Sequence, residues 1–178
     1  MTRRVEAGSA ALILVDFQER FAGAVSGFDA AVSRACVLAS MAQILAIKTV
    51  VTEQYPQGLG VTVSPLATAL GDFTPLEKTV FPATRAEGFD LGGATAAIVA
   101  GVEAHVCVAQ TVLDLLDAEI EVHVVADAVA SRSHADKDSA LARMRAEGAV
   151  VTTTEAILFE LTGGSSHPQF KALQGLVK

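Results

Sequence analysis

Short, wholly apolar runs that alternate with longer segments of helical periodicity constrain this chain most. Ala10–Val15 contains only Ala, Leu, Ile and Val, and residues 94–101 form a second run that is apolar apart from one Thr and a final Gly. A strand without polar alternation is buried on both faces, which is typical of a parallel sheet covered by helices on either side. Further strands are expected at 49–52, 78–81, 121–126 and 149–153, and helices at 28–47, 104–118, 134–147 and 155–161.

With right-handed crossovers, this order predicts an α/β fold of three layers, αβα. The centre would be a mostly parallel six-stranded sheet of the Rossmann-like kind. We find no repeat, linker or shift in composition, so residues 1–178 are expected to form one domain.

Charge and composition exclude several classes of partner. The net charge is −7, and no basic stripe is present, which argues against nucleic acid and anionic membranes. No apolar run approaches the ~20 residues that span a bilayer, and no signal-peptide pattern is seen, so a cytoplasmic location is expected. Hydrophobic residues make up 51% of the chain, and we expect part of this excess to form the interface of a homo-oligomer, a dimer or larger.

Polar residues follow the predicted strands. They are Asp16, Glu53, the segment 102–107, Asp127 and the segment 152–154. In open parallel sheets, ligands bind outside the carboxyl ends of the strands. The sequence therefore predicts that acidic and nucleophilic groups meet at one edge of the sheet.

Cys107 follows a buried strand and opens a predicted helix. Unpaired N–H groups and the positive end of the helix dipole meet at such a position, so we expect a lowered thiol pKa that favours the thiolate. The same N–H groups could hold a developing oxyanion. The alternative is an ordinary core cysteine, as Cys36 is expected to be.

Asp16 and Lys78 are the other candidates. A carboxylate that ends an apolar strand is costly to bury unless it is partnered, although a turn cap would also explain Asp16. A single lysine is usually a solvated surface charge, and Lys78 alone would indicate nothing more.

Taken together, these residues resemble the isochorismatase-like cysteine hydrolases. The resemblance covers nearly the whole chain in order, in the stretches LVDFQERF (14–21), EKTVF (77–81), GVEAHVCV (101–108), VADA (125–128) and VTTTE (151–155). The stretch VTEQYPQGLG (51–60) is similar to a narrower subgroup, the isochorismatase domain-containing proteins.

This resemblance implies a mechanism. Asp16 would take the thiol proton, Lys78 would orient Asp16 and stabilise negative charge, and Cys107 would attack a carbonyl to form an acyl-thioester. Backbone N–H groups of Glu103 and Cys107 would form the oxyanion hole, and the peptide bond between Val102 and Glu103 would be cis.

The partner would be a small molecule, bound without a cofactor. Possible pocket residues are Gln18, Phe21, Glu53, Tyr55 and His105. Nicotinamidases of this superfamily hold a metal through histidines after the second strand. Since no histidine lies between Glu53 and Lys78, we expect no metal here and no nicotinamidase activity.

A cysteine at this position favours cleavage of an amide-like C–N bond over the vinyl-ether cleavage of true isochorismatases. The alternative is a catalytically weak scaffold or binding protein of the same fold that acts through homo-oligomerisation. A nucleotide-binding Rossmann protein would need a Gly-x-Gly-x-x-Gly turn after a strand, and this sequence has none.

Overall fold

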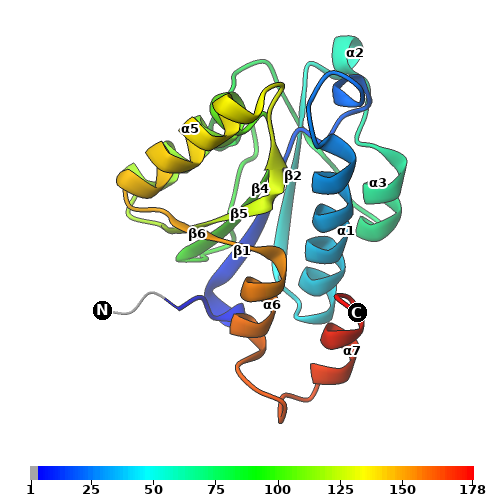
Figure 1. Cartoon of the computed structure of the whole chain (residues 1–178), viewed down its shortest axis with the longest axis vertical. Helices are drawn as coiled ribbons and strands as arrows, with labels where there is room; N and C mark the ends of the chain where they lie inside the picture. Colours follow the sequence, from blue (N-terminus) through cyan, green and yellow to red (C-terminus); the bar gives the residue numbers. More distant parts are fainter. Residues whose placement is uncertain (1–3) are drawn as a thin grey trace.

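Six parallel strands form one central sheet in the computed structural model, which describes residues 4–178 (Figure 1). The strands are β1 (Ala10–Val15), β2 (Lys48–Gln54), β3 (Leu76–Lys78), β4 (Ala96–Val102), β5 (Glu121–Ala130) and β6 (Val150–Thr152). Their order across the sheet is β3-β2-β1-β4-β5-β6, and every neighbouring pair is parallel. The predicted α/β fold with a six-stranded central sheet is confirmed. That residues 1–178 form a single domain stays a prediction, and residues 1–3 lie outside the described part.

Helices cover both faces of this sheet. They are α1 (Phe28–Ile44), α2 (Pro56–Leu59), α3 (Ser64–Leu70), α4 (Ala109–Asp117), α5 (His134–Ala146), α6 (Thr154–Thr162) and α7 (Phe170–Gly175). Three 3₁₀ turns, at Ala7–Ser9, Glu19–Phe21 and Ala83–Arg85, and a π-helical turn at Ala104–Val108 complete the elements.

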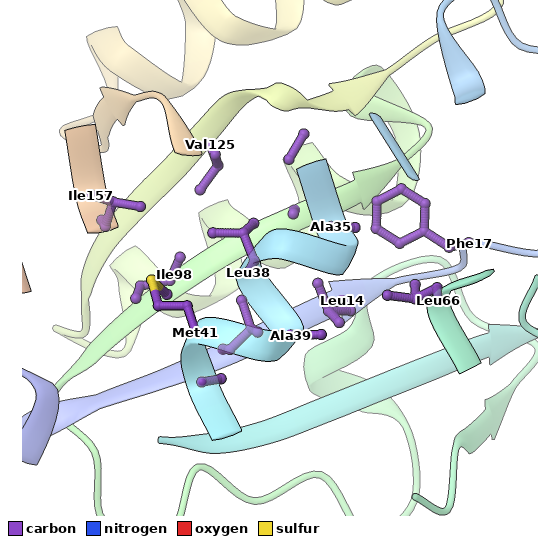
Figure 2. Packing of buried hydrophobic residues seen from close by; sticks show 14 of the residues in the cluster. Leu14, Phe17, Ala35, Leu38, Ala39, Met41, Leu66, Ile98, Val125 and Ile157 are labelled. Atoms are coloured by element: carbon purple, nitrogen blue, oxygen red, sulfur yellow. The ribbon is translucent and has the colours of Figure 1, made fainter. Parts of the chain in front are cut away.

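Alternate residues of β1 divide the core into two halves, because successive side chains of a strand point to opposite faces. Leu12 and Leu14 pack with α1, α3, α6 and α7 on one face, as Figure 2 shows for Leu14 and its neighbours. Ile13 and Val15 pack with α4 and α5 on the other. This division is the three-layer arrangement that the apolar runs predict.

The position of the site follows from the strand order. From β1 the chain passes through α1 on one face to β2 and β3, and then returns to β4 on the other side of β1. From β4 it continues through α4, which covers the opposite face. The carboxyl ends of β1 and β4 therefore flank a crevice between diverging connections, where open α/β sheets bind ligands.

Three elements end three or more residues away from their predicted ends. The strand predicted at 78–81 lies at Leu76–Lys78, because the chain turns after Lys78 and directs the carbonyl groups of Val80 and Phe81 to its ammonium. Helix α1 ends at Ile44, because Ala46 has a φ of 53° and cannot continue the helix. The strand predicted at 121–126 is β5, which extends to Ala130.

Gly101 lets β4 approach β1 closely. Its φ is 148°, and a Cβ atom there would collide with the carbonyl oxygen of Val15 and lie 2.6 Å from the Val15 Cβ. Val15 directly precedes Asp16, so any displacement at this contact would reach the site.

We therefore expect Gly101→Ala to lower the free energy of unfolding by about 2–4 kcal/mol, since it combines backbone strain with overpacking. Urea denaturation followed by circular dichroism measures this. Gly175→Ala is the matched control, because a Cβ there meets no atom within 4 Å, and its effect should stay within about 1 kcal/mol. Equal denaturation midpoints for the two variants would contradict the role given to Gly101.

Candidate active site

Asp16 lies at the carboxyl end of β1 with a fully buried side chain. Its φ of 55° is a conformation that Asp tolerates better than most residues. The carboxylate accepts a hydrogen bond of 2.7 Å from the Thr52 hydroxyl at Oδ1, and Oδ2 lies 2.6 Å from the Lys78 Nζ atom. Asp16 is thus paired with a cation rather than used as a turn cap.

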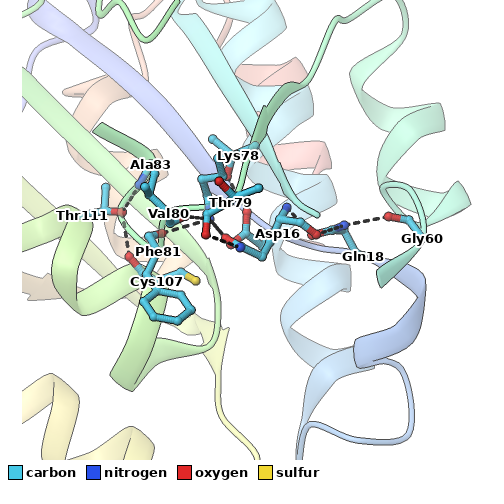
Figure 3. Close-up of polar contacts among 12 residues, drawn as sticks. Asp16, Gln18, Gly60, Lys78, Thr79, Val80, Phe81, Ala83, Cys107 and Thr111 are labelled. Carbon is cyan, nitrogen blue, oxygen red and sulfur yellow. Dashed lines mark hydrogen bonds and ion pairs between the residues drawn. The ribbon is translucent and has the colours of Figure 1, made fainter. Parts of the chain in front are cut away.

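Lys78 ends β3, and its side chain is completely shielded from solvent. Its ammonium donates to the Asp16 carboxylate, to the Gln54 side-chain oxygen at 2.8 Å and to the Phe81 carbonyl oxygen at 2.9 Å (Figure 3). These three short contacts match the three N–H groups of a lysine, and the Val80 carbonyl oxygen is a fourth, longer contact at 3.4 Å. Lys78 is therefore a fixed internal charge and not a solvated surface one.

Cys107 belongs to the π-helical turn between β4 and α4, and only 5% of its surface is exposed. The Val108 N–H donates to the Glu103 carbonyl oxygen at 3.2 Å, and the Thr111 hydroxyl donates to the Cys107 carbonyl oxygen at 2.7 Å. The Thr111 oxygen also accepts from the Ala83 N–H at 2.8 Å. Thr111 thus ties the π-helical turn that carries Cys107 to the loop that follows Lys78 (Figure 3).

The environment raises the pKa of the Cys107 thiol to about 12. Burial is the largest cause, the negative charge of Asp16 raises the pKa further, and the positive charge of Lys78 lowers it. The predicted lowering of this pKa was wrong, because desolvation and the carboxylate outweigh the lysine. The thiol is therefore protonated at neutral pH, beside an ion pair whose two charges both act on it.

Glu103 precedes this turn, and its peptide bond with Val102 is cis. The Glu103 carboxylate accepts from the Arg132 side chain, with Nη2 at 2.6 Å, and from the Arg132 N–H at 2.9 Å. Hydrogen bonding by Arg132 is the largest cause that lowers the Glu103 pKa, so its carboxylate stays charged. His105, nearby, has its Nδ1 atom 3.0 Å from the Ser131 hydroxyl.

A comparison with known protein families identifies the family to which this chain belongs. The family model of the Isochorismatase domain matches residues 10–156, which include Asp16, Lys78 and Cys107. The chain belongs to the isochorismatase family. As a member of that family it is a hydrolase.

Relatives of this isochorismatase-family hydrolase cover almost its whole length. Isochorismatase domain-containing protein 2 of Homo sapiens is 43% identical over 98% of this chain and 86% of its own, and that of Bos taurus is 46% identical over the same shares. A solved structure of MAR1 ribonuclease from Caenorhabditis elegans has a TM-score of 0.92 at 42% identity, over 98% of this chain and 92% of its own. YcaC from Pseudomonas aeruginosa, solved with hexane-2,5-diol and covalent acrylamide, has a TM-score of 0.87 at 26% identity, over 99% of this chain and 92% of its own.

Two residues predicted for the pocket of this hydrolase have structural partners. The Gln18 side chain is fully buried and accepts from the Gln54 N–H while it donates to the carbonyl oxygens of Gln54 and Gly60. The Glu53 carboxylate accepts from the N–H and the hydroxyl of Thr62, both at 2.7 Å. Both residues fasten the loop after β2.

Two cavities adjoin the site. Tyr55 lines one of about 290 Å³ at the edge strand β3, and Phe21 lines another of about 270 Å³ together with Glu103. The first reaches Lys78 only at its backbone, since that side chain is fully shielded. The second is lined by residues that follow β1 and β4, Phe21 and Glu103 among them, but not by Asp16, Lys78 or Cys107.

Asp127 does not join this group. It lies within β5, and its carboxylate accepts from the N–H and the hydroxyl of Thr154 at 2.8 and 3.0 Å. Asp127 thus satisfies the first N–H group of α6, which is a structural role.

Sequence reasoning missed three residues that hold the site together: Thr52, Gln54 and Thr111. The first two are alternate residues of β2 and so point to the same face, toward the ends of β1 and β3. Thr111 lies four residues after Cys107, one helical turn away, where a hydroxyl can reach the carbonyl oxygen. These spacings were the available signals.

Within residues 4–178, no three His, Cys, Asp or Glu side chains gather closely enough to hold a metal ion. That the enzyme works without a metal stays a prediction. None of the helices between residues 4 and 178 has the length and apolarity that a bilayer crossing requires.

Proposed function

We propose that this chain is a cysteine hydrolase that cleaves a small substrate at an amide-like C–N bond, through an acyl-thioester on Cys107. One observation carries the proposal: the fully shielded ion pair of Asp16 and Lys78 faces Cys107, and both charges act on the thiol. A buried ion pair is costly to maintain for stability alone, and a nucleophile with an adjacent base is a recognised catalytic arrangement.

The first half of the reaction forms the thioester. Asp16 takes the thiol proton as the sulfur attacks the substrate carbonyl carbon, and the backbone N–H groups of Glu103 and Cys107 receive the resulting oxyanion. When the tetrahedral intermediate collapses, the C–N bond breaks and Asp16 returns the proton to the leaving nitrogen.

The second half releases the acid. Water attacks the thioester carbonyl carbon and gives a proton to Asp16, and the carbon–sulfur bond breaks as the sulfur recovers that proton. Lys78 holds the Asp16 carboxylate in place and stabilises the sulfur while it carries negative charge. A thiol pKa of about 12 means that deprotonation accompanies attack rather than precedes it.

Two relatives bear on this proposal. The covalent acrylamide in YcaC from Pseudomonas aeruginosa indicates a reactive nucleophile in that neighbour, since acrylamide alkylates nucleophiles. The ribonuclease name of the Caenorhabditis elegans neighbour makes RNA cleavage a second candidate. The net charge of −7 disfavours RNA, because affinity for a phosphate backbone depends on clustered positive charge.

Mass spectrometry of the intact protein after incubation with a panel of small amides tests the proposal. We expect a mass increase equal to the acyl group, located on Cys107, in the wild type and in Cys36→Ser, and no such increase in Cys107→Ser. Turnover should fall at least about 10³-fold in Cys107→Ser, since the nucleophile is removed. A defined homo-oligomer without adduct or turnover across the panel would favour the scaffold alternative, and cleavage of RNA by Cys107→Ser would contradict the mechanism.

A further inference from the structure

The cavity of about 270 Å³ beside Glu103 is shaped by the connections that follow four neighbouring strands. Arg20 and Phe21 follow β1, Leu59 follows β2, Glu103 follows β4 and Arg132 follows β5. The cavity therefore spans the point where the connections of β1 and β4 diverge, which is where ligands bind in open parallel sheets. It shares Glu103 with the turn that carries Cys107.

The 3₁₀ turn that carries Arg20, Glu19–Phe21, is held in place by hydrogen bonds. The Glu19 N–H donates to the Val61 carbonyl oxygen at 3.1 Å, and the Gln18 side chain donates to the Gly60 carbonyl oxygen at 2.7 Å. These bonds join the loop after β1 to the loop after β2, directly before Arg20 and directly after Leu59 in the sequence. Arg20 thus projects from a 3₁₀ turn fixed at its start and not from a free loop.

The charges around the cavity leave one cation uncompensated. Arg132 is neutralised by Glu103, which accepts from its Nε and Nη2 atoms. Arg20 also lines the cavity, and within residues 4–178 its side chain makes no hydrogen bond or ion pair. Among the charged residues that line the cavity, Arg20, whose side chain is exposed to solvent, is therefore the one without a charged partner.

The rest of the lining is apolar. Phe21, Ala24, Val25 and Leu59 supply it, so the cavity combines a hydrocarbon surface with a single free guanidinium. A guanidinium binds a carboxylate through two parallel N–H groups, which gives orientation as well as affinity. A short carbon chain that ends in a carboxylate matches this lining in both respects.

We propose that the substrate is a small amide that carries a carboxylate, and that Arg20 binds this carboxylate in the cavity beside Glu103. The proposal rests on the proposed cysteine chemistry, which places the amide carbonyl at Cys107. The substrate class is the monoamides of short dicarboxylic acids and similar acids with an amide a few bonds from the carboxylate. Arg20 is then a specificity-determining residue.

Matched probes test this class. Malonamate, succinamate and glutaramate each carry one carboxylate and one amide, and their diamides replace the carboxylate with a neutral group of nearly the same shape. Binding is measured by ligand-observed NMR on Cys107→Ser protein, and acylation of Cys107 is measured by mass spectrometry on protein with the native cysteine. Arg20→Gln removes the charge, Arg20→Lys keeps it, and Arg145→Gln makes the same change in net charge at an exposed position on α5.

We expect at least one monoamide acid to bind tenfold or more tightly than its diamide, with the preference lost in Arg20→Gln, partly kept in Arg20→Lys and unchanged in Arg145→Gln. A preference that survives in Arg20→Gln would overturn the role of Arg20, as would failure of all three acids to bind. Preferential binding that depends on Arg20 but gives no adduct would uphold the carboxylate site and contradict the acyl-thioester. Adducts that form equally from acids and diamides would overturn the carboxylate site alone.

Discussion

Asp16→Asn should abolish turnover and at the same time make Cys107 react faster with iodoacetamide. Asn keeps the shape of Asp and can still accept from Thr52, but it takes no proton, so we expect kcat to fall by about 10³-fold. Alkylation needs only the thiolate. In the variant, the negative charge that raises the thiol pKa is gone while the Lys78 charge that lowers it stays.

The pH dependence of the alkylation rate shows in which direction the substitution shifts the Cys107 pKa. With a wild-type pKa of about 12, the Cys107 alkylation rate should rise about tenfold per pH unit from pH 7 to 10 without a plateau. In Asp16→Asn the same rise should begin from a higher rate and level off at a lower pH. The Cys36 rate, followed in the same digests by peptide mapping, should be identical in both proteins. If Asp16→Asn slowed alkylation of Cys107 as strongly as it slowed turnover, Asp16 would be a structural support for the thiol and not its base.

Lys78→Met should lower the free energy of unfolding by about 3–5 kcal/mol, because it leaves the Asp16 carboxylate buried without its cation. It also removes the donor to Gln54 and Phe81. In the double variant Asp16→Asn/Lys78→Met no unpaired charge is left inside, so its cost should be smaller than the sum of the two single costs by about 1–3 kcal/mol.

Urea denaturation at constant pH measures this cycle. Lys48→Met is the matched control, since Lys48 also contacts a carboxylate at 2.7 Å, that of Asp90, but with side chains 43% and 67% exposed. An exposed pair of this kind contributes about 0–1 kcal/mol, so the control should change stability little. Costs that simply add in the double variant would show that Asp16 and Lys78 act independently.

The parts of the molecule that sequence could predict are those fixed by burial on both faces. The apolar runs of β1 and β4 indicated a parallel sheet, and from the sheet followed the edge at which Asp16 and Cys107 meet. The three-residue strand β3 could not be placed, because so short an edge strand carries almost no periodic signal. Its end at Lys78 depends on carbonyl groups that only the folded loop directs at the ammonium.

The electrostatics of the site were harder to predict from the sequence than the fold. A cysteine at the start of a helix suggests a low pKa, but the value at Cys107 depends on how deeply the sulfur is buried and on which partner charge lies nearer. Neither the burial of the sulfur nor its distance to each charge can be predicted from the residues around Cys107. The role of Gln18 also depends on contacts between distant segments. We predicted it to line the pocket, but its side-chain amide forms three hydrogen bonds that join the loops after β1 and β2.

The state of the resting sulfur also determines how this protein meets oxidants. Hydrogen peroxide attacks thiolates, so a sulfur that keeps its proton and is almost sealed from water is a slow target for conversion to sulfenic acid. Cys36, the other thiol of the chain, packs on the opposite face of the sheet and cannot form a rescuing disulfide with it. We therefore expect the resting Cys107 thiol to be oxidised slowly, because it is both protonated and buried.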